Sequence, residues 1–256
     1  MTSDLVYVAT ALMAVLTAFI AGVWLSPRLR AGRIVYDTTP DRPIGFGPEM
    51  TWLAVKSGDT FEVAAALGVE HLTPANWSTG LGTVHDNELG DGRVFFTPPV
   101  DGWTLVVGRA LPVPLGKAFV DKCTPLLATL GRRFPEAQMF AVHDAIDYVA
   151  WARASRGAVE RGVACSDVDL VWSVGATTAE ERALGLKGYE LRGVEARVGD
   201  AGGRMLLRPT EAHVLALAAK WSLDPMQLDV NRTGVSSGFV ALAPRDWRME
   251  RSRSAA

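Results

Sequence analysis

The chain has 256 residues, a formal net charge of −2 and a hydrophobic fraction of 48%. A chain of this length buries enough apolar surface to fold without disulfide or metal staples. The near-neutral charge excludes a global basic field of the kind that attracts nucleic acid, and the basic residues do not cluster on a recognisable binding element. Nucleic acid is therefore not an expected partner.

Residues 5–25 form an uncharged apolar run that predicts a transmembrane helix, preceded by a short flank at residues 1–4. At 1.5 Å per residue the run gives about 32 Å of helix, close to the thickness of the hydrocarbon core, roughly 30 Å. A cleaved signal peptide is the alternative. The flank has no basic side chain, the apolar run is long and no small-residue cleavage site follows it, so the sequence favours a retained anchor.

The charges on the two sides of this run predict its orientation. Asp4 precedes the run, whereas Arg28, Arg30 and Arg33 follow it. The positive-inside rule places the arginine side in the cytoplasm. We therefore expect a single-pass protein of the inner (cytoplasmic) membrane whose soluble domain lies in the cytoplasm.

Prolines and glycines divide the rest of the chain. They predict a linker over residues 26–49, a soluble domain over residues 50–243 and a loose, charged tail over residues 244–256. Cys123 and Cys165 are the two cysteines of the domain. Two buried thiols in a reducing compartment fit the predicted topology best, and one long-range disulfide is the alternative.

Within the domain, hydrophobic period and turn residues predict the helices and strands. In chain order we expect a strand over 51–55, a helix over 61–67, strands over 93–97 and 103–107, a helix over 116–130, strands over 138–142, 146–152, 159–165 and 170–174, and helices over 179–184 and from 210 to 221. For residues 186–209 we expect a β-hairpin or an irregular segment. Because the strands come in adjacent groups, the pattern predicts an α+β fold with antiparallel sheets and packed helices. The order of helices and strand groups recurs once, which indicates an internal duplication.

Several blocks of the domain resemble a set of uncharacterised bacterial proteins of this domain size. The blocks are PANW at 74–77, FTPPVDGWTLVVG at 96–108, YVAWAR at 148–153 and WSLDP at 221–225. The resemblance covers about residues 50–240 and implies no catalytic residue. Small domains of this kind are often suspected of being immunity proteins or partners in toxin systems, which is an analogy at the level of the family.

Residues 55–60, VKSGDT, together with Gly68, Val69 and Asn76, resemble the opening of a LysM peptidoglycan-binding module. The interval between Thr60 and Gly68 is shorter than usual, and such a module covers only a small part of this domain. A cytoplasmic domain also could not reach the cell wall. A plain turn followed by a capped helix is the favoured interpretation of this segment.

His143, Asp144 and Asp147 form the only tight cluster of titratable residues in the sequence. A histidine beside carboxylates can act as a general base with an orienting group, as a hydrolase would need. A polar turn between two strands is the more ordinary interpretation. The sequence has no metal-ligand spacing, no G-x-S-x-G elbow and no P-loop. It therefore predicts no metal and no cofactor, and leans away from an enzyme.

Seven of the eight tryptophans lie outside the predicted span, and most are expected in the core. Near the proline-rich turn at 98–102, Trp77, Trp103 and Arg109 are candidate binding residues, because Trp and Arg dominate binding energy at interfaces. We therefore expect a membrane-tethered, non-enzymatic protein-binding domain that is immunity-like and neutralises a toxin. The alternatives are a LysM-like peptidoglycan-binding module and a hydrolase-type enzyme that uses His143, Asp144 and Asp147. The expected partner is a protein of unknown identity.

Overall fold

The computed structural model describes residues 12–22, 34–47, 49–167, 169–190, 203–228 and 234–252. The chain divides into two compact units, Met1–Val35 and Tyr36–Ala256. In the first unit, residues 12–22 form a helix on which six large apolar side chains are each at least 50% exposed. Among the described residues, no helix is both long enough and apolar enough to cross a membrane. The two ends of the predicted span, residues 5–11 and 23–25, lie outside the described residues, so the anchor stays a prediction.

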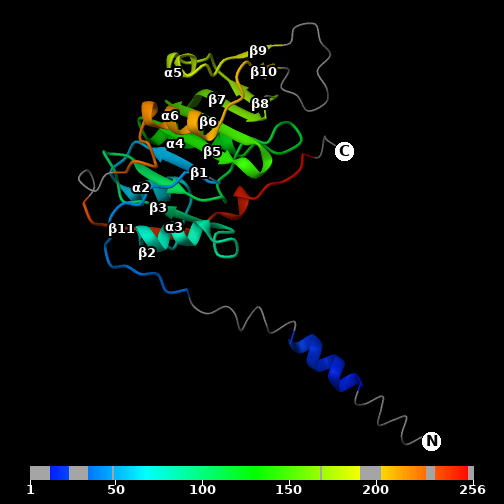
Figure 1. The fold of residues 1–256 in the computed structure, drawn as a ribbon. Coiled ribbons are helices and arrows are strands. Elements are labelled where there is room, and N and C mark those ends of the chain that lie inside the picture. Colours follow the sequence, from blue (N-terminus) through cyan, green and yellow to red (C-terminus); the bar gives the residue numbers. More distant parts are fainter. Residues whose placement is uncertain are drawn as a thin grey trace, which may run out of the picture. The chain divides into compact units, whose positions relative to one another are not determined.

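The second unit is built on one sheet of eleven described strands, which run in the order β2-β11-β3-β4-β1-β5-β6-β7-β8-β10-β9 (Figure 1). Every neighbouring pair is antiparallel. The strands are β1 (Thr51–Val55), β2 (Thr73–Asn76), β3 (Arg93–Phe96), β4 (Thr104–Val107), β5 (Ala137–His143), β6 (Tyr148–Ser155), β7 (Ala158–Ser166), β8 (Asp169–Val174), β9 (Gly188–Glu190), β10 (Gly203–Met205) and β11 (Ser237–Leu242). The predicted antiparallel α+β class is confirmed.

Helices cover both faces of this sheet. They are α2 (Thr60–Ala66), α3 (Trp77–His85), α4 (Cys123–Arg133), α5 (Ala179–Ala183) and α6 (Glu211–Trp221), with short 3₁₀ turns η1 (Asp144–Ile146) and η2 (Arg245–Trp247). Successive side chains of a strand point to opposite faces. Trp52 of β1 therefore joins the hydrophobic core formed with α3 and α6, whereas Leu53 joins the core formed with α2 and α4. All five residues of β1 are buried, as expected of a strand covered on both faces.

The structure corrects the start of the helix predicted over residues 116–130, because α4 begins only at Cys123. Gly116 has a φ of +77°, a left-handed conformation that does not continue a helix. Pro125 then falls in the first turn of α4, where its missing N–H costs no helical hydrogen bond. The Asp121 carboxylate accepts a hydrogen bond from the Thr124 N–H at 3.0 Å and so supports the new start.

The sequence patterns missed α3, β2 and β11. Two glycines lower the helical propensity of α3, yet one of them is required by packing. A Cβ atom on Gly80 would lie 2.2 Å from the Phe95 ring, so the close approach of helix and sheet needs a glycine there. The predicted internal duplication stays a prediction.

Residues 36–47, predicted to be linker, belong to the second unit. The Phe46 side chain is buried and meets the Trp52 ring edge-on, with 5.9 Å between the ring centroids. Asp41 reaches the N-terminus of α3, where its carboxylate accepts hydrogen bonds from the backbone N–H groups of Trp77 at 2.7 Å and Ser78 at 2.9 Å. Unpaired N–H groups at a helix start favour such an anionic partner. The folded domain therefore begins about fourteen residues earlier than the predicted Met50, at Tyr36.

Most of the predicted loose tail is also docked. Trp247 of η2 is buried in the core on the α2 and α4 side. Further along, the Val120 N–H donates to the Glu250 carbonyl at 3.0 Å, and the Ser252 N–H donates to the Ala118 carbonyl at 2.9 Å. The described tail therefore holds residues 118–120 in place through these backbone hydrogen bonds. Residues 253–256 of the predicted tail lie outside the described residues.

We predict that Asp41→Ala lowers the free energy of unfolding by about 1–2 kcal/mol, because it removes the partner of the N–H groups at the start of α3. Urea denaturation of the full-length chain, followed by tryptophan fluorescence, measures the change. Asp91→Ala, at an exposed turn residue, is the matched control and should change stability by less than about 0.5 kcal/mol. Equal effects of the two substitutions would contradict a capping role for Asp41.

Candidate functional site

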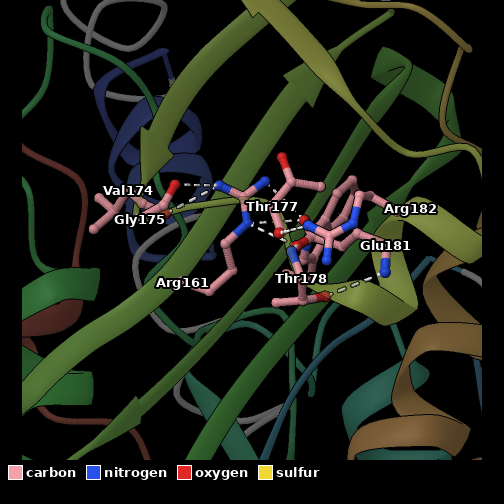
Figure 2. Close-up of polar contacts among 8 residues, drawn as sticks. Arg161, Val174, Gly175, Thr177, Thr178, Glu181 and Arg182 are labelled. Carbon is pink, nitrogen blue, oxygen red and sulfur yellow. Dashed lines mark hydrogen bonds and ion pairs between the residues drawn. The ribbon is translucent and has the colours of Figure 1, made fainter.

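A buried ion pair connects α5 to the sheet at β7. Arg161 of β7 and Glu181 of α5 face each other in Figure 2, with 2.7 Å between Nη2 and Oε1. The Arg161 Nε–H also donates to both carboxylate oxygens, at 2.9 and 2.8 Å. The two side chains are only 6% and 0% exposed, so water does not screen the pair.

Neutral groups complete the shell of this ion pair. The Glu181 carboxylate accepts further hydrogen bonds from the Thr178 N–H at 2.7 Å and from the Trp151 indole N–H at 2.8 Å. Burial alone would raise the pKa of Glu181, but the hydrogen bonds from Arg161, Thr178 and Trp151 outweigh burial and hold the pKa below its ordinary value. A carboxylate held in this way stays ionised and enclosed, which suits a structural role.

Arg161 also fixes the end of β8. Its Nη1 donates to the carbonyl oxygens of Val174 at 3.1 Å and Gly175 at 3.0 Å, as the dashed lines in Figure 2 show. The same guanidinium therefore joins α5, β7 and the C-terminal end of β8. The position of β8 is thus set by a buried charge as well as by its pairing with β7.

A bulge in β8 turns two neighbouring side chains to one face. Trp172 pairs with Ala164 of β7, but Leu170 pairs with Cys165, so Val171 is an extra residue. Val171 and Trp172 both pack against the core on the α2 and α4 side. A Cβ atom on Gly162 would lie 2.1 Å from the Trp172 ring, so a glycine at this position makes room for the indole.

A pocket of about 370 Å³ lies between β8 and residues 114–121, and we call it the β8 pocket. Its main apolar lining residues are Leu115, Phe119, Val120, Val171 and Trp172. Val120 is 46% exposed, and Trp172 is the one described tryptophan that is not buried. The Tyr148 hydroxyl donates to the Pro114 carbonyl at 2.6 Å. This hydrogen bond attaches the wall formed by residues 114–121 to β6 of the sheet. The volume falls within the roughly 300–1,000 Å³ range of ligand pockets.

The predicted binding residues Trp77, Trp103 and Arg109 do not form a common surface. Trp77 is fully buried and Trp103 is 6% exposed, so both rings are core side chains. Arg109 donates to the carbonyl oxygens of His85 at 2.5 Å and Asp86 at 3.1 Å, and so stabilises the C-terminal end of α3. The sequence pattern did not distinguish Trp172 from the buried tryptophans.

The predicted cluster around His143 is a turn whose side chains have other partners. His143 is partly buried and its Nε2 lies 3.1 Å from the Thr51 hydroxyl oxygen. Burial lowers the pKa of His143. Asp144 starts η1 and is exposed, while Asp147 forms an ion pair with Arg208. Among the described residues, no hydrogen bond joins His143 to either aspartate, and the polar-turn interpretation describes the segment.

The segment that resembles a LysM opening forms the turn between β1 and α2. The Asp59 carboxylate accepts hydrogen bonds from the N–H groups of Phe61 at 2.9 Å and Glu62 at 3.0 Å, as an N-cap does. β1 pairs with β4 and β5 in the middle of the large sheet. The segment is therefore an integral part of the domain, joined to its large sheet through β1.

The cysteines and other metal-ligating side chains form no centre within the described residues. Cys123 and Cys165 are both free and buried. Burial raises the pKa of both thiols, to about 12 for Cys165, so neither is a reactive thiolate near neutral pH. In the part of the chain that the structure describes, no group of three or more His, Cys, Asp or Glu side chains could hold a metal ion.

Comparison with known proteins gives no relative for this chain. No protein-family model, no curated protein and no solved structure matches it. The resemblance of its sequence blocks to uncharacterised bacterial proteins therefore stays a prediction.

We predict that Arg161→Met lowers the free energy of unfolding by about 3–5 kcal/mol, because it leaves the Glu181 carboxylate buried without its counter-charge. The double variant Arg161→Met with Glu181→Gln should recover much of this loss, since a neutral amide keeps an acceptor for Trp151 and carries no charge. Urea denaturation of the wild type, both single variants and the double variant measures the coupling.

The exposed ion pair between Arg204 and Asp169 is the matched control for this experiment, with 3.4 Å between Nε and Oδ1. Arg204→Met should cost no more than about 1 kcal/mol, because water screens an exposed pair. If the effects of Arg161→Met and Glu181→Gln simply add, the two side chains are not coupled and the structural role of the pair is refuted.

Proposed function

We propose that the second unit is a protein-binding domain and that the β8 pocket is its binding surface. The observation that carries this proposal is the partly exposed Trp172 in the wall of an apolar pocket, in a domain whose other described tryptophans are buried. A large aromatic ring exposed beside other apolar side chains is typical of residues that dominate binding energy at protein interfaces.

The composition of the pocket favours binding over catalysis. Lys117 and Asp121 are its only titratable lining residues, and both are exposed. A general base works best when its environment brings its pKa near the working pH, and a nucleophile needs a neighbouring base. The pocket instead offers apolar walls with a polar rim, which suits an apolar side chain of a partner protein.

The proposed function also includes a membrane tether at residues 5–25, with the arginine side in the cytoplasm. Its support is the uncharged sequence of this run and the exposed apolar side chains of the helix over residues 12–22. A helix that is apolar all round is stable only in apolar surroundings. The biological role that we propose is that of an immunity-like protein of the inner membrane, which binds and neutralises a toxin.

Membrane fractionation tests the tether. The full-length protein should sediment with membranes, resist extraction by high salt and be released by detergent. The double variant Leu16→Lys with Phe19→Lys should shift to the soluble fraction, because each lysine at the middle of a span costs about 2.5–3.5 kcal/mol on insertion. A wild-type protein that stays in the soluble fraction contradicts the tether and leaves the binding proposal intact.

A random peptide library displayed on phage tests the binding surface. We predict that the full-length protein in detergent micelles selects peptides, and that Trp172→Ala raises the Kd of a synthetic selected peptide by about 30-fold or more. This is the loss expected from about 2 kcal/mol at an interface hot spot.

Phe61→Ala is the matched control, since Phe61 of α2 is an exposed aromatic residue, 60% exposed, that does not line the pocket. Its Kd for the same peptide should stay within about twofold of wild type, as expected of a surface substitution outside the contact. Equal binding by wild type and Trp172→Ala, with both proteins folded, refutes the β8 pocket as the binding surface.

A further inference from the structure

One wall of the β8 pocket contains neither a helix nor a strand of the sheet. This wall is the segment of residues 114–121, and most of its residues line the pocket. Because the segment lacks the regular backbone hydrogen bonds of a helix or a sheet, other parts of the chain have to hold it. At its start, the Tyr148 hydroxyl donates to the Pro114 carbonyl. Further along, the wall is held by residues 248–252 of the C-terminal tail, which we call the strap.

The strap meets the wall in an antiparallel arrangement at Phe119, whose side chain lines the β8 pocket. On one side of Phe119, the Val120 N–H donates to the Glu250 carbonyl at 3.0 Å. On its other side, the Ala118 carbonyl accepts from the Ser252 N–H at 2.9 Å. The strap therefore fixes the backbone of the wall on both sides of a residue that lines the pocket.

Two largely enclosed side chains attach the strap to the domain. Trp247, immediately before the strap, is buried in the core on the α2 and α4 side. The Lys122 side chain is only 18% exposed, and its Nζ donates to the Arg248 carbonyl at 2.7 Å. The same Nζ lies 3.5 Å from a carboxylate oxygen of Glu250. Core packing and a partly buried charge thus hold the strap where it can support the wall.

The contacts of the strap give the β8 pocket a preformed wall. Holding a chain segment in one conformation costs conformational entropy, and the hydrogen bonds from the strap offset part of this cost. A wall that is already held loses little further freedom when a ligand enters, which favours binding. Without the strap, the binding step itself would have to order the wall, and affinity at the pocket would fall.

We propose that the strap regulates the β8 pocket. When it is docked, it holds Phe119 and Val120 in the position that binds a side chain of a partner protein, and when it is released the pocket has no formed wall. This inference rests on the proposed binding function and names what regulates that site. Because coupling between two sites is reciprocal, a partner in the pocket also stabilises the docked strap. Capture or removal of the C-terminal tail would lower affinity at the pocket.

Ser252→Pro tests the strap, because proline has no N–H to donate to the Ala118 carbonyl. Hydrogen-exchange mass spectrometry is carried out on the full-length protein in detergent micelles. The fragment that covers residues 114–121 should exchange about tenfold faster than in wild type, whereas fragments of β1 should keep their wild-type rate. The Kd of a Trp172-dependent peptide from the display selection should rise by about tenfold or more.

Lys122→Met is a second variant, which keeps the aliphatic part of the side chain and removes the Nζ donor to the Arg248 carbonyl. It should change exchange and Kd in the same direction as Ser252→Pro. Met249→Pro is the matched control within the strap. Met249 is 70% exposed, and Arg248 before it already has the φ of −61° and ψ of 141° that suit a residue preceding proline. Exchange and Kd of this control should stay within about twofold of wild type.

The results that would overturn this inference are distinct from failure of the proposed function. If Ser252→Pro leaves the exchange of residues 114–121 unchanged, the strap does not hold the wall. If exchange rises while the Kd stays the same, the strap does not regulate binding, and the proposed function survives through Trp172. If no peptide binds in a Trp172-dependent way, the proposed function fails and its regulation with it. Faster exchange in β1 would reveal a general loss of structure in Ser252→Pro, and Lys122→Met then decides.

Discussion

The domain depends on a sheet that must be covered on both faces. β1 lies in the middle of that sheet, and the alternation of its side chains sends Trp52 to one core and Leu53 to the other. Because both cores need helices, the chain places α3 and α6 on one face and α2 and α4 on the other. Towards β8 this cover on the α2 and α4 side passes from α4 to the irregular segment 114–121, and the β8 pocket lies between this segment and β8.

The sequence predicted the parts of this fold that local patterns determine. The strand at 51–55, the strand group from β5 to β8 and the capped start of α5 follow from hydrophobic period and turn residues. The missed features depend on contacts between residues far apart in the sequence. Asp41 supports α3 across 36 positions, and the tail holds residues 118–120 across more than a hundred. The candidate site was missed for the same reason, since nothing local distinguishes Trp172, which lines the β8 pocket, from Trp151, which is fully buried two strands away.

The main described charge clusters of the chain have structural partners. Arg161 and Glu181 are enclosed and fully engaged with each other and with backbone groups. Asp147 is held by Arg208, and Arg109 is occupied by the carbonyl groups at the end of α3. These charges stabilise turns, helix ends and the position of β8. The β8 pocket, in contrast, is lined mainly by partly exposed apolar side chains, and a surface of this composition suits the binding that we propose.

The chain holds β2 and β8 in place by different contacts. At β2 the chain covers its own edge, because the Asn76 N–H donates to the Asp37 carbonyl at 2.8 Å and the Asn76 side-chain amide donates to the Thr39 carbonyl at 3.0 Å. Open strand edges invite uncontrolled pairing, so proteins usually protect them. Among the described residues, β10 meets β8 at the pair of Arg204 and Asp169, and Arg161 holds the C-terminal end of β8 through the Val174 carbonyl. Because β8 is held through Arg161 and through its pairing with β7, the Val171 and Trp172 side chains that line the β8 pocket are already positioned, and such preorganisation lowers the cost of binding there.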